Sequence, residues 1–181
     1  MKATGIVRRI DDLGRVVVPK EIRRTLRIRE GDPLEIFTDR EGEIILKKYS
    51  PIGELGEFAQ QYADSLAQTT GHTIAISDKD QFIATAGNSK KELLNKSITN
   101  ELEKVINDRQ VVVEGKSEKG FVSIIEDELD YTYQAISPII SEGDAIGAVV
   151  ILTKDPKEKF GETQVQLAST AASFLGSQME Q

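Results

Sequence analysis

Residues 14–32 read GRVVVPKEIRRTLRIREGD, and this stretch predicts a strand, a very short helix and a turn in immediate succession. Val16–Val18 are three β-branched residues in a row, which favours an extended strand. Pro19 has no N–H to give to a ladder, and its fixed φ suits the first position of a helix. We therefore expect the strand to end and the helix to begin at Pro19, and Gly31 to close the unit with a turn to Asp32.

The predicted helix carries an unusual concentration of cations. Helical spacing places Ile22 and Leu26 on one apolar face, which we expect to be buried. It also forms two rows of like charges, Lys20 with Arg24 and Arg23 with Arg27. Each like-charge pair costs about 0.2–0.5 kcal/mol. Negative charge from a partner would relieve this repulsion, and a nucleic-acid backbone is the obvious candidate. A solvated face that aids solubility is the alternative.

The charge of the chain is unevenly spread. The 181 residues carry a formal net charge of −7, yet residues 1–29 hold nine basic and three acidic side chains, a net charge of +6. Residues 1–50 together carry +3, so the remainder carries −10. A basic N-terminal segment, here called the head (residues 1–50), followed by an acidic remainder, here called the body, is typical of a nucleic-acid-binding module joined to a second domain. The acidic body would repel a polyanion, so we expect contact in the head alone.

The composition excludes several kinds of site. The chain has no Cys and one His, which leaves no disulfide framework, no thiolate metal site and no ordinary zinc cluster. We expect no cofactor. No apolar run approaches the roughly 20 residues that cross a membrane, and the first residues lack the apolar core of a secretory signal. The expectation is a cytoplasmic protein with no membrane partner.

Four short strands are predicted around the helix within the first fifty residues. Apolar alternation places them at residues 5–10, 16–18, 34–38 and 43–49. The acidic residues between these strands are expected to shape turns. Such a small unit buries too little apolar surface to be stable alone, so we expect it to oligomerise. A two-fold dimer would present matched cationic surfaces to two-fold-symmetric DNA.

Residues 1–50 resemble the N-terminal DNA-binding domain of the AbrB transition-state regulators, which belong to the swapped-hairpin class. The resemblance is carried by a nearly continuous run: TGIVRRID at 4–11, LGRVVVPKEIR at 13–23, Leu26 and Gly31-Asp32. It implies a β-rich dimer in which hairpins interlock between two chains. The DNA-contacting residues it implies are Arg8, Arg9, Arg15, Arg23 and Arg24, with Lys2, Lys20 and Arg27 as secondary candidates.

The head has a restricted set of side chains with which to read DNA. Residues 1–31 contain no Asn, Gln or Ser, so the usual bidentate readers of adenine are missing. Arginine can still read guanine, enter a narrow minor groove or hold phosphates. We hypothesise that specificity rests largely on DNA shape and deformability, with a loose consensus sequence.

A domain boundary is predicted at residues 50–54, where Pro and Gly end the fourth strand. A helical stripe then runs from Leu55 to Leu66 and ends before Gly71. A second stripe, at heptad spacing, runs from Val165 to Met179 through small residues. These helices either cover the sheet of their own domain or also pair two chains in a bundle, which would make the protein a tetramer.

The region between the two helices is rich in predicted strands. They fall at 73–77, 82–86, 111–113, 121–125, 131–140 and 145–152, with short helices at 90–94 and 100–108. This order, with ISPII at 136–140, Gly143 and IGAVV at 146–150, resembles the GAF sensor domain. GAF domains typically bind small molecules between the sheet and a variable middle segment. The resemblance implies a possible ligand among residues from about 88 to 133, without identifying it.

Little in the second half indicates catalysis. His72 could act as a base, but no serine elbow or Cys accompanies it, and it follows a helix end, where His commonly meets the helix dipole. The acidic run at 126–130 could hold a cation or could be a solvated turn. We expect neither a catalytic residue nor a metal site.

The expected fold class is α+β in two domains. An N-terminal swapped-hairpin β-barrel, dimeric and AbrB-like, would span residues 1–50, followed by a linker at 51–55 and an α/β GAF-like sensor domain, bracketed by two helices, at 56–181. The whole chain resembles sporulation regulators of spore-forming bacteria. That resemblance implies a transcriptional activator and repressor, not an enzyme, associated with the nucleoid and acting with double-stranded DNA, other copies of itself and a possible small-molecule ligand.

Two other functions remain open from the sequence. The first is a swapped-hairpin antitoxin, although antitoxins usually follow this domain with a short disordered arm, and here about 130 patterned residues follow. The second is an enzyme in the second half of the chain. Limited proteolysis separates the antitoxin from the regulator, because a disordered arm is destroyed and a domain survives.

Overall fold

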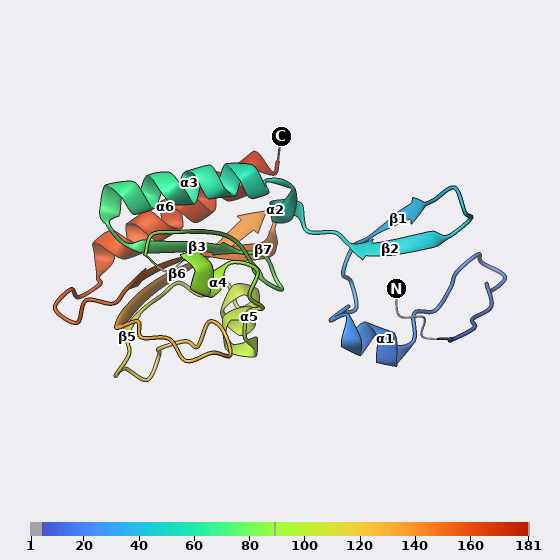
Figure 1. Ribbon diagram of the computed structural model, residues 1–181, viewed down its shortest axis with the longest axis horizontal. Helices are drawn as coiled ribbons and strands as arrows, with labels where there is room; N and C mark the ends of the chain where they lie inside the picture. The colour runs from blue at the N-terminus through green and yellow to red at the C-terminus, as the bar shows by residue number, and fades with distance from the viewer. Residues whose placement is uncertain (1–4, 89, 181) are drawn as a thin grey trace. The chain divides into compact units, whose positions relative to one another are not determined.

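The computed structural model describes residues 5–88 and 90–180 and divides the chain into two compact units, one ending at Tyr49 and the other starting at Ser50 (Figure 1). Lys2, one of the secondary DNA-contact candidates, lies outside the described residues. In the described part of the chain, no helix combines the length and the apolar character needed to cross a bilayer.

The first unit holds one short helix and one hairpin. Helix α1 (Lys20–Thr25) begins directly after Pro19. Strands β1 (Leu34–Thr38) and β2 (Ile44–Lys48) pair antiparallel in a two-stranded sheet. These elements confirm the predicted helix and the third and fourth predicted strands.

Two turns of the first unit are built in the same way. In each, Oδ1 of an aspartate, Asp11 or Asp39, accepts hydrogen bonds of 2.8–3.0 Å from the backbone N–H groups two and four residues later. The glycine three residues after the aspartate has a positive φ, 76° at Gly14 and 85° at Gly42, which only glycine adopts without cost. The acidic side chains at these turns therefore shape the backbone, as predicted.

The strands predicted at 5–10 and 16–18 are wrong for a single chain, because the described residues of these two arms form no ladder. Their apolar side chains find no cover: Val7 is 89% exposed and Val17 is 68% exposed. Sheet pairing in these arms needs apolar surface that the chain by itself does not supply.

The second unit alternates helices and strands. Its helices are α2 (Pro51–Glu54), α3 (Gly56–Thr70), α4 (Lys90–Leu93), α5 (Asn100–Asn107) and α6 (Glu162–Gln178). Its strands are β3 (Thr73–Ser77), β4 (Phe82–Ala86), β5 (Val112–Gly115), β6 (Tyr133–Ser141) and β7 (Asp144–Thr153). The segment expected to be a linker carries α2, whose Ile52 is fully buried in this unit.

The five strands of the second unit form one antiparallel sheet in the order β4-β3-β7-β6-β5. Helices α3 and α6 lie side by side over one face, and α5 packs on the other (Figure 1). Along β3, Ile74 and Ile76 enter the core under α3 and α6, whereas Ala75 enters the core under α5. Because both faces are covered, the central strands are apolar at almost every position.

The strand predicted at 121–125 is also wrong, because these residues form a loop over the sheet. Strand β6 already pairs with β7 on one side and β5 on the other, so it offers no free edge. With its amide oriented so that both of its polar atoms have partners, the buried side chain of Gln134 on β6 donates to the carbonyl of Val122 (3.0 Å) and accepts from the N–H of Val122 (2.5 Å). Val122, Ile124 and Ile125 are buried in the core that α5 covers.

A partly buried contact joins the segment between α3 and β3 to the segment before α6. Nε2 of His72 lies 2.7 Å from Oε1 of Glu158, and the imidazole packs edge-on against Phe160. The hydroxyl of Thr153 donates to the other carboxylate oxygen of Glu158 (2.8 Å). The hydrogen bond with His72, and then that from Thr153, lower the pKa of Glu158 below its usual value. His72 therefore has a packing role at this junction.

Glu158→Gln is expected to make unfolding less sensitive to acid. Because the folded-state pKa of Glu158 lies below the unfolded value, its carboxylate stabilises the fold above the unfolded pKa, and this contribution is lost as the pH falls through the folded pKa. Denaturant unfolding at neutral pH and at about pH 3 should show the wild type more stable at neutral pH and the gap closing in acid. The Glu158 side chain is 40% exposed, so the gap should stay within about 1 kcal/mol.

The control for this experiment is Asp130→Asn, which removes an exposed loop carboxylate that has no hydrogen bond or ion pair within the described residues. That variant should follow the wild type at both pH values. If all three proteins lose stability equally in acid, Glu158 does not contribute as described.

Candidate nucleic-acid interface

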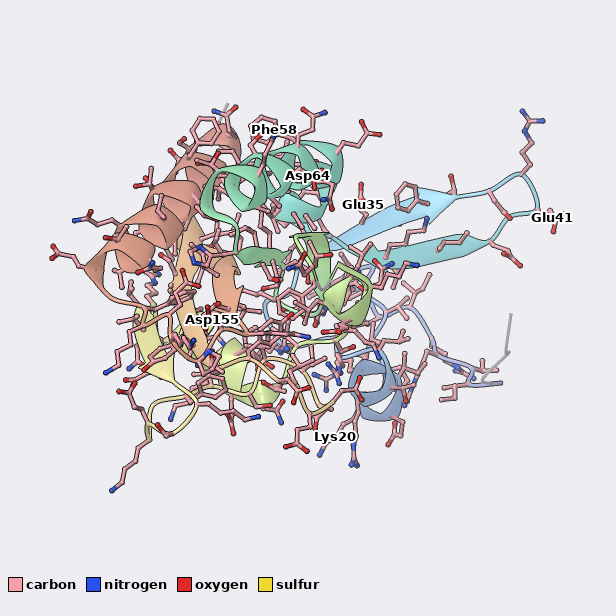
Figure 2. The ribbon with its side chains drawn as sticks, turned by 60° about the vertical axis from the view of Figure 1, so that its left-hand side comes forward. Lys20, Glu35, Glu41, Phe58, Asp64 and Asp155 are labelled. Carbon is pink, nitrogen blue, oxygen red and sulfur yellow. The ribbon has the colours of Figure 1, made fainter. Side chains whose placement is uncertain are left out.

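Helix α1 brings three of the expected DNA-contacting cations together. Lys20, Arg23 and Arg24 all lie within its six residues, and Figure 2 shows Lys20 projecting outward. Lys20 and Arg24 are exposed; Arg23 is half-buried, and its Nε has no hydrogen-bond partner among the described residues. The face of Ile22 and Leu26 was expected to be buried, but no residue of α1 is buried and Leu26 is 56% exposed. This face, like the arms, lacks a cover in the single chain.

Arg27 lies just beyond the helix, in the left-handed region with φ of 53°. The N–H of Ile28 donates to the carbonyl of Arg23 (2.7 Å), and the N–H of Arg27 donates to that of Arg24 (3.4 Å). This is the Schellman pattern, in which glycine usually occupies the left-handed position. Nζ of Lys48 on β2 donates to the Arg27 carbonyl (2.9 Å) and ties the helix end to the hairpin. The prediction that Arg23 and Arg27 are helical neighbours is wrong, because the helix ends before Arg27.

Arg27→Gly is expected to stabilise α1 by about 1 kcal/mol, because glycine relieves the left-handed strain of a Cβ-bearing residue. Hydrogen exchange of the α1 amides should therefore slow. The matched control is Arg24→Gly, which removes the same charge from inside the helix and should cost about 1 kcal/mol. A shift of the same sign in both variants would contradict the assignment of strain to Arg27.

The other expected arginines lie on the arms around the first turn. Arg8 and Arg9 are exposed, and neither side chain has a hydrogen bond or ion pair within the described residues. Arg15 donates from Nε to Oδ2 of Asp11 (2.9 Å) and remains 69% exposed. The backbone N–H of Arg15, and less strongly its guanidinium, lower the pKa of Asp11. The two terminal nitrogens of Arg15 stay available for an external acceptor.

The first unit thus offers guanidinium groups from two elements, the arms and α1. The paired N–H donors of a guanidinium group match two phosphate oxygens or the O6 and N7 acceptors of guanine. No group of three His, Cys, Asp or Glu side chains within residues 5–88 and 90–180 is arranged to hold a metal ion. The chemistry available to these arginines is recognition of an anion.

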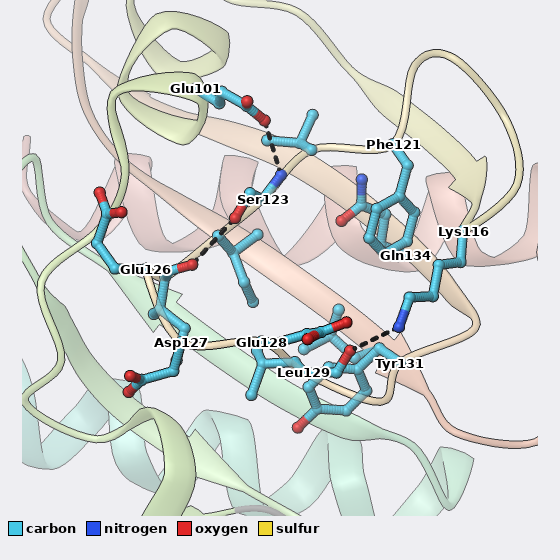
Figure 3. A pocket seen from close by; sticks show the side chains of 14 residues that line it. Glu101, Lys116, Phe121, Ser123, Glu126, Asp127, Glu128, Leu129, Tyr131 and Gln134 are labelled. Carbon is cyan, nitrogen blue, oxygen red and sulfur yellow. Dashed lines mark hydrogen bonds between the residues drawn. The ribbon is translucent and has the colours of Figure 1, made fainter.

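The second unit contains a cavity of about 420 Å³ over the sheet face that α5 covers (Figure 3). Its apolar lining consists of Phe121, Val122, Ile124, Ile125, Leu129, Tyr131 and Leu152. Its polar lining consists of Glu101, Lys116, Ser123, Glu126, Asp127, Glu128 and Gln134. All of these residues except Gln134 and Leu152 fall between residues 88 and 133, the segment that the GAF resemblance implied.

Hydrogen bonds hold the loop that forms one wall of the cavity. Oε2 of Glu101 on α5 accepts from the N–H of Ser123 (2.9 Å), and the Ser123 hydroxyl donates to the carbonyl of Ile125 (3.0 Å). Nζ of Lys116 donates to the carbonyl of Leu129 (3.1 Å). No pattern in the sequence marks the cavity itself, because its walls come from a helix, a loop and two strands that only the fold brings together.

Two family profiles match the chain, one for each unit. Residues 54–180 match the family described as stage V sporulation protein T C-terminal, transcription factor. Residues 7–54 match the family described as antidote-toxin recognition MazE, bacterial antitoxin.

Individual proteins show the same division. The chain is 59% identical over 183 residues to stage V sporulation protein T of Bacillus subtilis (strain 168), covering 100% of both chains. It is 67% identical over 51 residues to the transition state regulatory protein AbrB of the same organism, covering 28% of this chain and 52% of AbrB.

A solved structure identifies the fold of the second unit. The GAF domain of an Acinetobacter phosphoenolpyruvate-protein phosphotransferase is similar with a TM-score of 0.57 and 16% identity, covering 72% of this chain and 88% of that chain. At this identity the likeness concerns the fold alone. The predicted combination of an AbrB-like first unit with a GAF-like second unit is confirmed.

Proposed function

Because the chain belongs to the stage V sporulation protein T family of transcription factors, we propose that it regulates sporulation genes by binding double-stranded DNA through its first unit. The observation that carries this proposal is the set of exposed arginines on the arms and α1, within a segment of charge +6 in a chain of charge −7. Neutralising phosphates with such cations supplies most of the affinity of proteins for DNA. The regulator would act on the nucleoid, in the cytoplasm, activating some promoters and repressing others.

A second copy of the chain would complete the DNA-binding surface. Among the described residues, all but two of the large apolar side chains that are exposed belong to the first unit: Ile6, Val7, Ile10, Leu13, Val16, Val17, Leu26, Ile36, Phe37, Ile44 and Leu46. An apolar surface of this extent marks an interaction site. Interlocked hairpins of two chains would cover it, let the arms pair as strands and present each arginine twice.

Fluorescence anisotropy of a labelled DNA duplex titrated with the full chain tests the proposal. We expect binding whose log K falls linearly with log salt, with a slope of about −0.9 for each phosphate neutralised. No binding even in dilute buffer, by a chain whose circular dichroism is that of a folded protein, would contradict DNA binding.

The way in which DNA is recognised has its own test. We propose that shape and deformability supply most of the specificity, since residues 1–31 lack Asn and Gln. Affinities for duplexes that differ only at flexible steps outside the protein's reach should then differ measurably. If those changes have no effect, and single base swaps each cost about 1–3 kcal/mol, the arginines read bases directly.

We also propose that the helices of the second unit join two dimers into a tetramer. Three aromatic side chains gather where α3 and α6 lie side by side: the ring of Phe174 is 5.8 Å from that of Phe58 and 5.3 Å from that of Tyr62. Figure 2 shows Phe58 on the outward side of α3, and Phe174 is 40% exposed. Aromatic side chains of this kind are enriched at protein–protein interfaces.

Phe174→Glu is expected to halve the mass of the assembly, because a carboxylate buried in an apolar interface is strongly unfavourable. Sedimentation equilibrium measures the mass. The matched control is Val111→Glu, which places the same charge on an exposed apolar residue just before β5 and should leave the mass unchanged. A wild-type mass retained by Phe174→Glu would place the second interface elsewhere.

The second unit would let the regulator respond to a small molecule. Its cavity has the volume of a small-molecule site and opens on the segment where GAF domains place their ligands. The antitoxin alternative accounts for residues 7–54 and leaves the folded second unit without a role. The enzyme alternative gains no support from His72, which packs against Glu158 and Phe160 and does not line the cavity.

A further inference from the structure

We propose that the cavity of the second unit selects a small organic ammonium ion with an apolar body. This inference rests on the proposed sensor role of the cavity and adds the charge and the chemical class of its ligand. It follows from which side chains face the cavity and from which of them already have partners.

The cavity offers an apolar surface for the body of the ligand. Tyr131, Leu152, Ile124 and Ile125 line it and are themselves buried. An apolar group placed against them leaves water, which favours binding. A volume of about 420 Å³ admits a bicyclic ring.

The charged lining is predominantly negative. The residues that line the cavity include four carboxylates, those of Glu101, Glu126, Asp127 and Glu128, and one ammonium, that of Lys116. Figure 3 shows Glu101, Glu128 and Lys116 directed toward the middle of the cavity, and Glu126 and Asp127 directed away from it. Asp127 pairs instead with Lys96, whose Nζ is 2.8 Å away.

The two carboxylates that face the cavity have oxygen atoms without a hydrogen-bond partner in the described part of the chain. Glu128 has no hydrogen bond or ion pair within the described residues, and Glu101 uses only Oε2, toward Ser123. A carboxylate without a partner binds an ammonium group through charge-assisted hydrogen bonds. Lys116 donates to the carbonyl of Leu129 and keeps its positive charge, which offsets one of the four carboxylates and leaves the lining with a net negative charge.

The same arrangement discriminates against anions. No arginine or histidine lines the cavity among the described residues. A ligand phosphate or carboxylate would meet the four carboxylates of the lining, with Lys116 and Lys154, whose Nζ lies 5.2 Å from the centre of the Tyr131 ring, to offset them. Repulsion of this kind is how a site rejects a ligand of similar shape. A neutral ligand would gain the apolar burial and no electrostatic attraction.

Three indoles that differ only in their terminal group test the inference: tryptamine, tryptophol and indole-3-acetate. The chain has no Trp, so indole fluorescence excited beyond the tyrosine absorption band reports the probe alone. Titration of each probe with the full chain should show tryptamine binding about two- to fivefold more tightly than tryptophol, the value of an ion pair with an exposed carboxylate such as that of Glu128. Indole-3-acetate should bind more weakly still.

A variant and a matched control assign the preference to the cavity. Glu128→Gln should bring the affinity for tryptamine close to that for tryptophol and leave tryptophol unchanged. Glu57→Gln removes an exposed carboxylate from α3, on the opposite face of the sheet, and should keep the full preference.

The outcomes separate the ligand class from the sensor role. Tryptophol or indole-3-acetate binding as tightly as tryptamine would overturn the charge assignment and leave the sensor role standing. Binding of none of the three would overturn the assignment and remove the support that the cavity gives to the sensor role. A preference for tryptamine that survives in Glu128→Gln would overturn the placement of the ligand beside Glu128.

Discussion

Arg8→Ala combined with Arg24→Ala is expected to lower the affinity for duplex DNA by about a thousandfold, since the symmetric dimer proposed above would then lack four cations that each contribute at least about 1 kcal/mol. The salt dependence should flatten as well, because the slope changes by about 0.9 for each phosphate that is no longer neutralised, or about 4 in all. Anisotropy titrations at several salt concentrations measure both quantities.

The double variant should fold normally, because both side chains are exposed and neither has a hydrogen bond or ion pair within the described residues. Its matched control is Lys91→Ala with Lys104→Ala, which removes the same charge from the second unit. The control should bind DNA as the wild type does. Equal losses of affinity in the two double variants would mean that overall charge, rather than the first unit, governs binding.

Gly176→Ala is expected to destabilise the second unit by about 1–3 kcal/mol, the usual cost of overpacking a core. A Cβ at this position of α6 would lie 2.0 Å from the backbone carbonyl oxygen of Ile140 on β6. Neither atom belongs to a flexible side chain, so the helix must move off the sheet. Denaturant unfolding followed by circular dichroism measures the loss of stability.

The matched control is Gly56→Ala, at the start of α3, where a Cβ would meet nothing within 4 Å. Helix propensity alone then determines the change in stability, and it favours alanine over glycine by up to about 1 kcal/mol. The two substitutions are chemically identical and should shift stability in opposite directions. A stabilising effect of Gly176→Ala would mean that α6 does not approach β6 as closely as described.

The positions predicted correctly are those where a few neighbouring residues restrict the backbone. Pro19 starts α1, and Gly71, with φ of 75°, ends α3. The turns at Asp11 and Asp39 close through bonds within four residues. Sustained apolar periodicity predicted α3, α6 and each of the five strands of the sheet, together with a sixth strand at 121–125 that does not form, because each element buries a continuous face.

The candidate DNA-binding site could be predicted from the sequence in part. Charge and the run of residues shared with AbrB pointed to the first unit, since cations near one another in sequence stay near one another in a short helix and a turn. The left-handed Arg27 was missed, because nothing local marks an arginine where a Schellman turn usually has glycine. The arms at 5–10 and 16–18 were predicted as strands, and a single chain gives them no surface on which to pair.

By itself, the sequence determined the two-unit organisation, most elements of secondary structure and the basic character of the head. These properties depend on residues within a turn or two of each other and on the sum of the charges. Only the tertiary structure decided that Gln134 would bind Val122 and turn a predicted strand into a loop, that Gly176 would touch β6, and that residues from 101 to 152 would enclose a cavity. Each of these depends on packing between segments distant in the chain, whose partners no local pattern specifies.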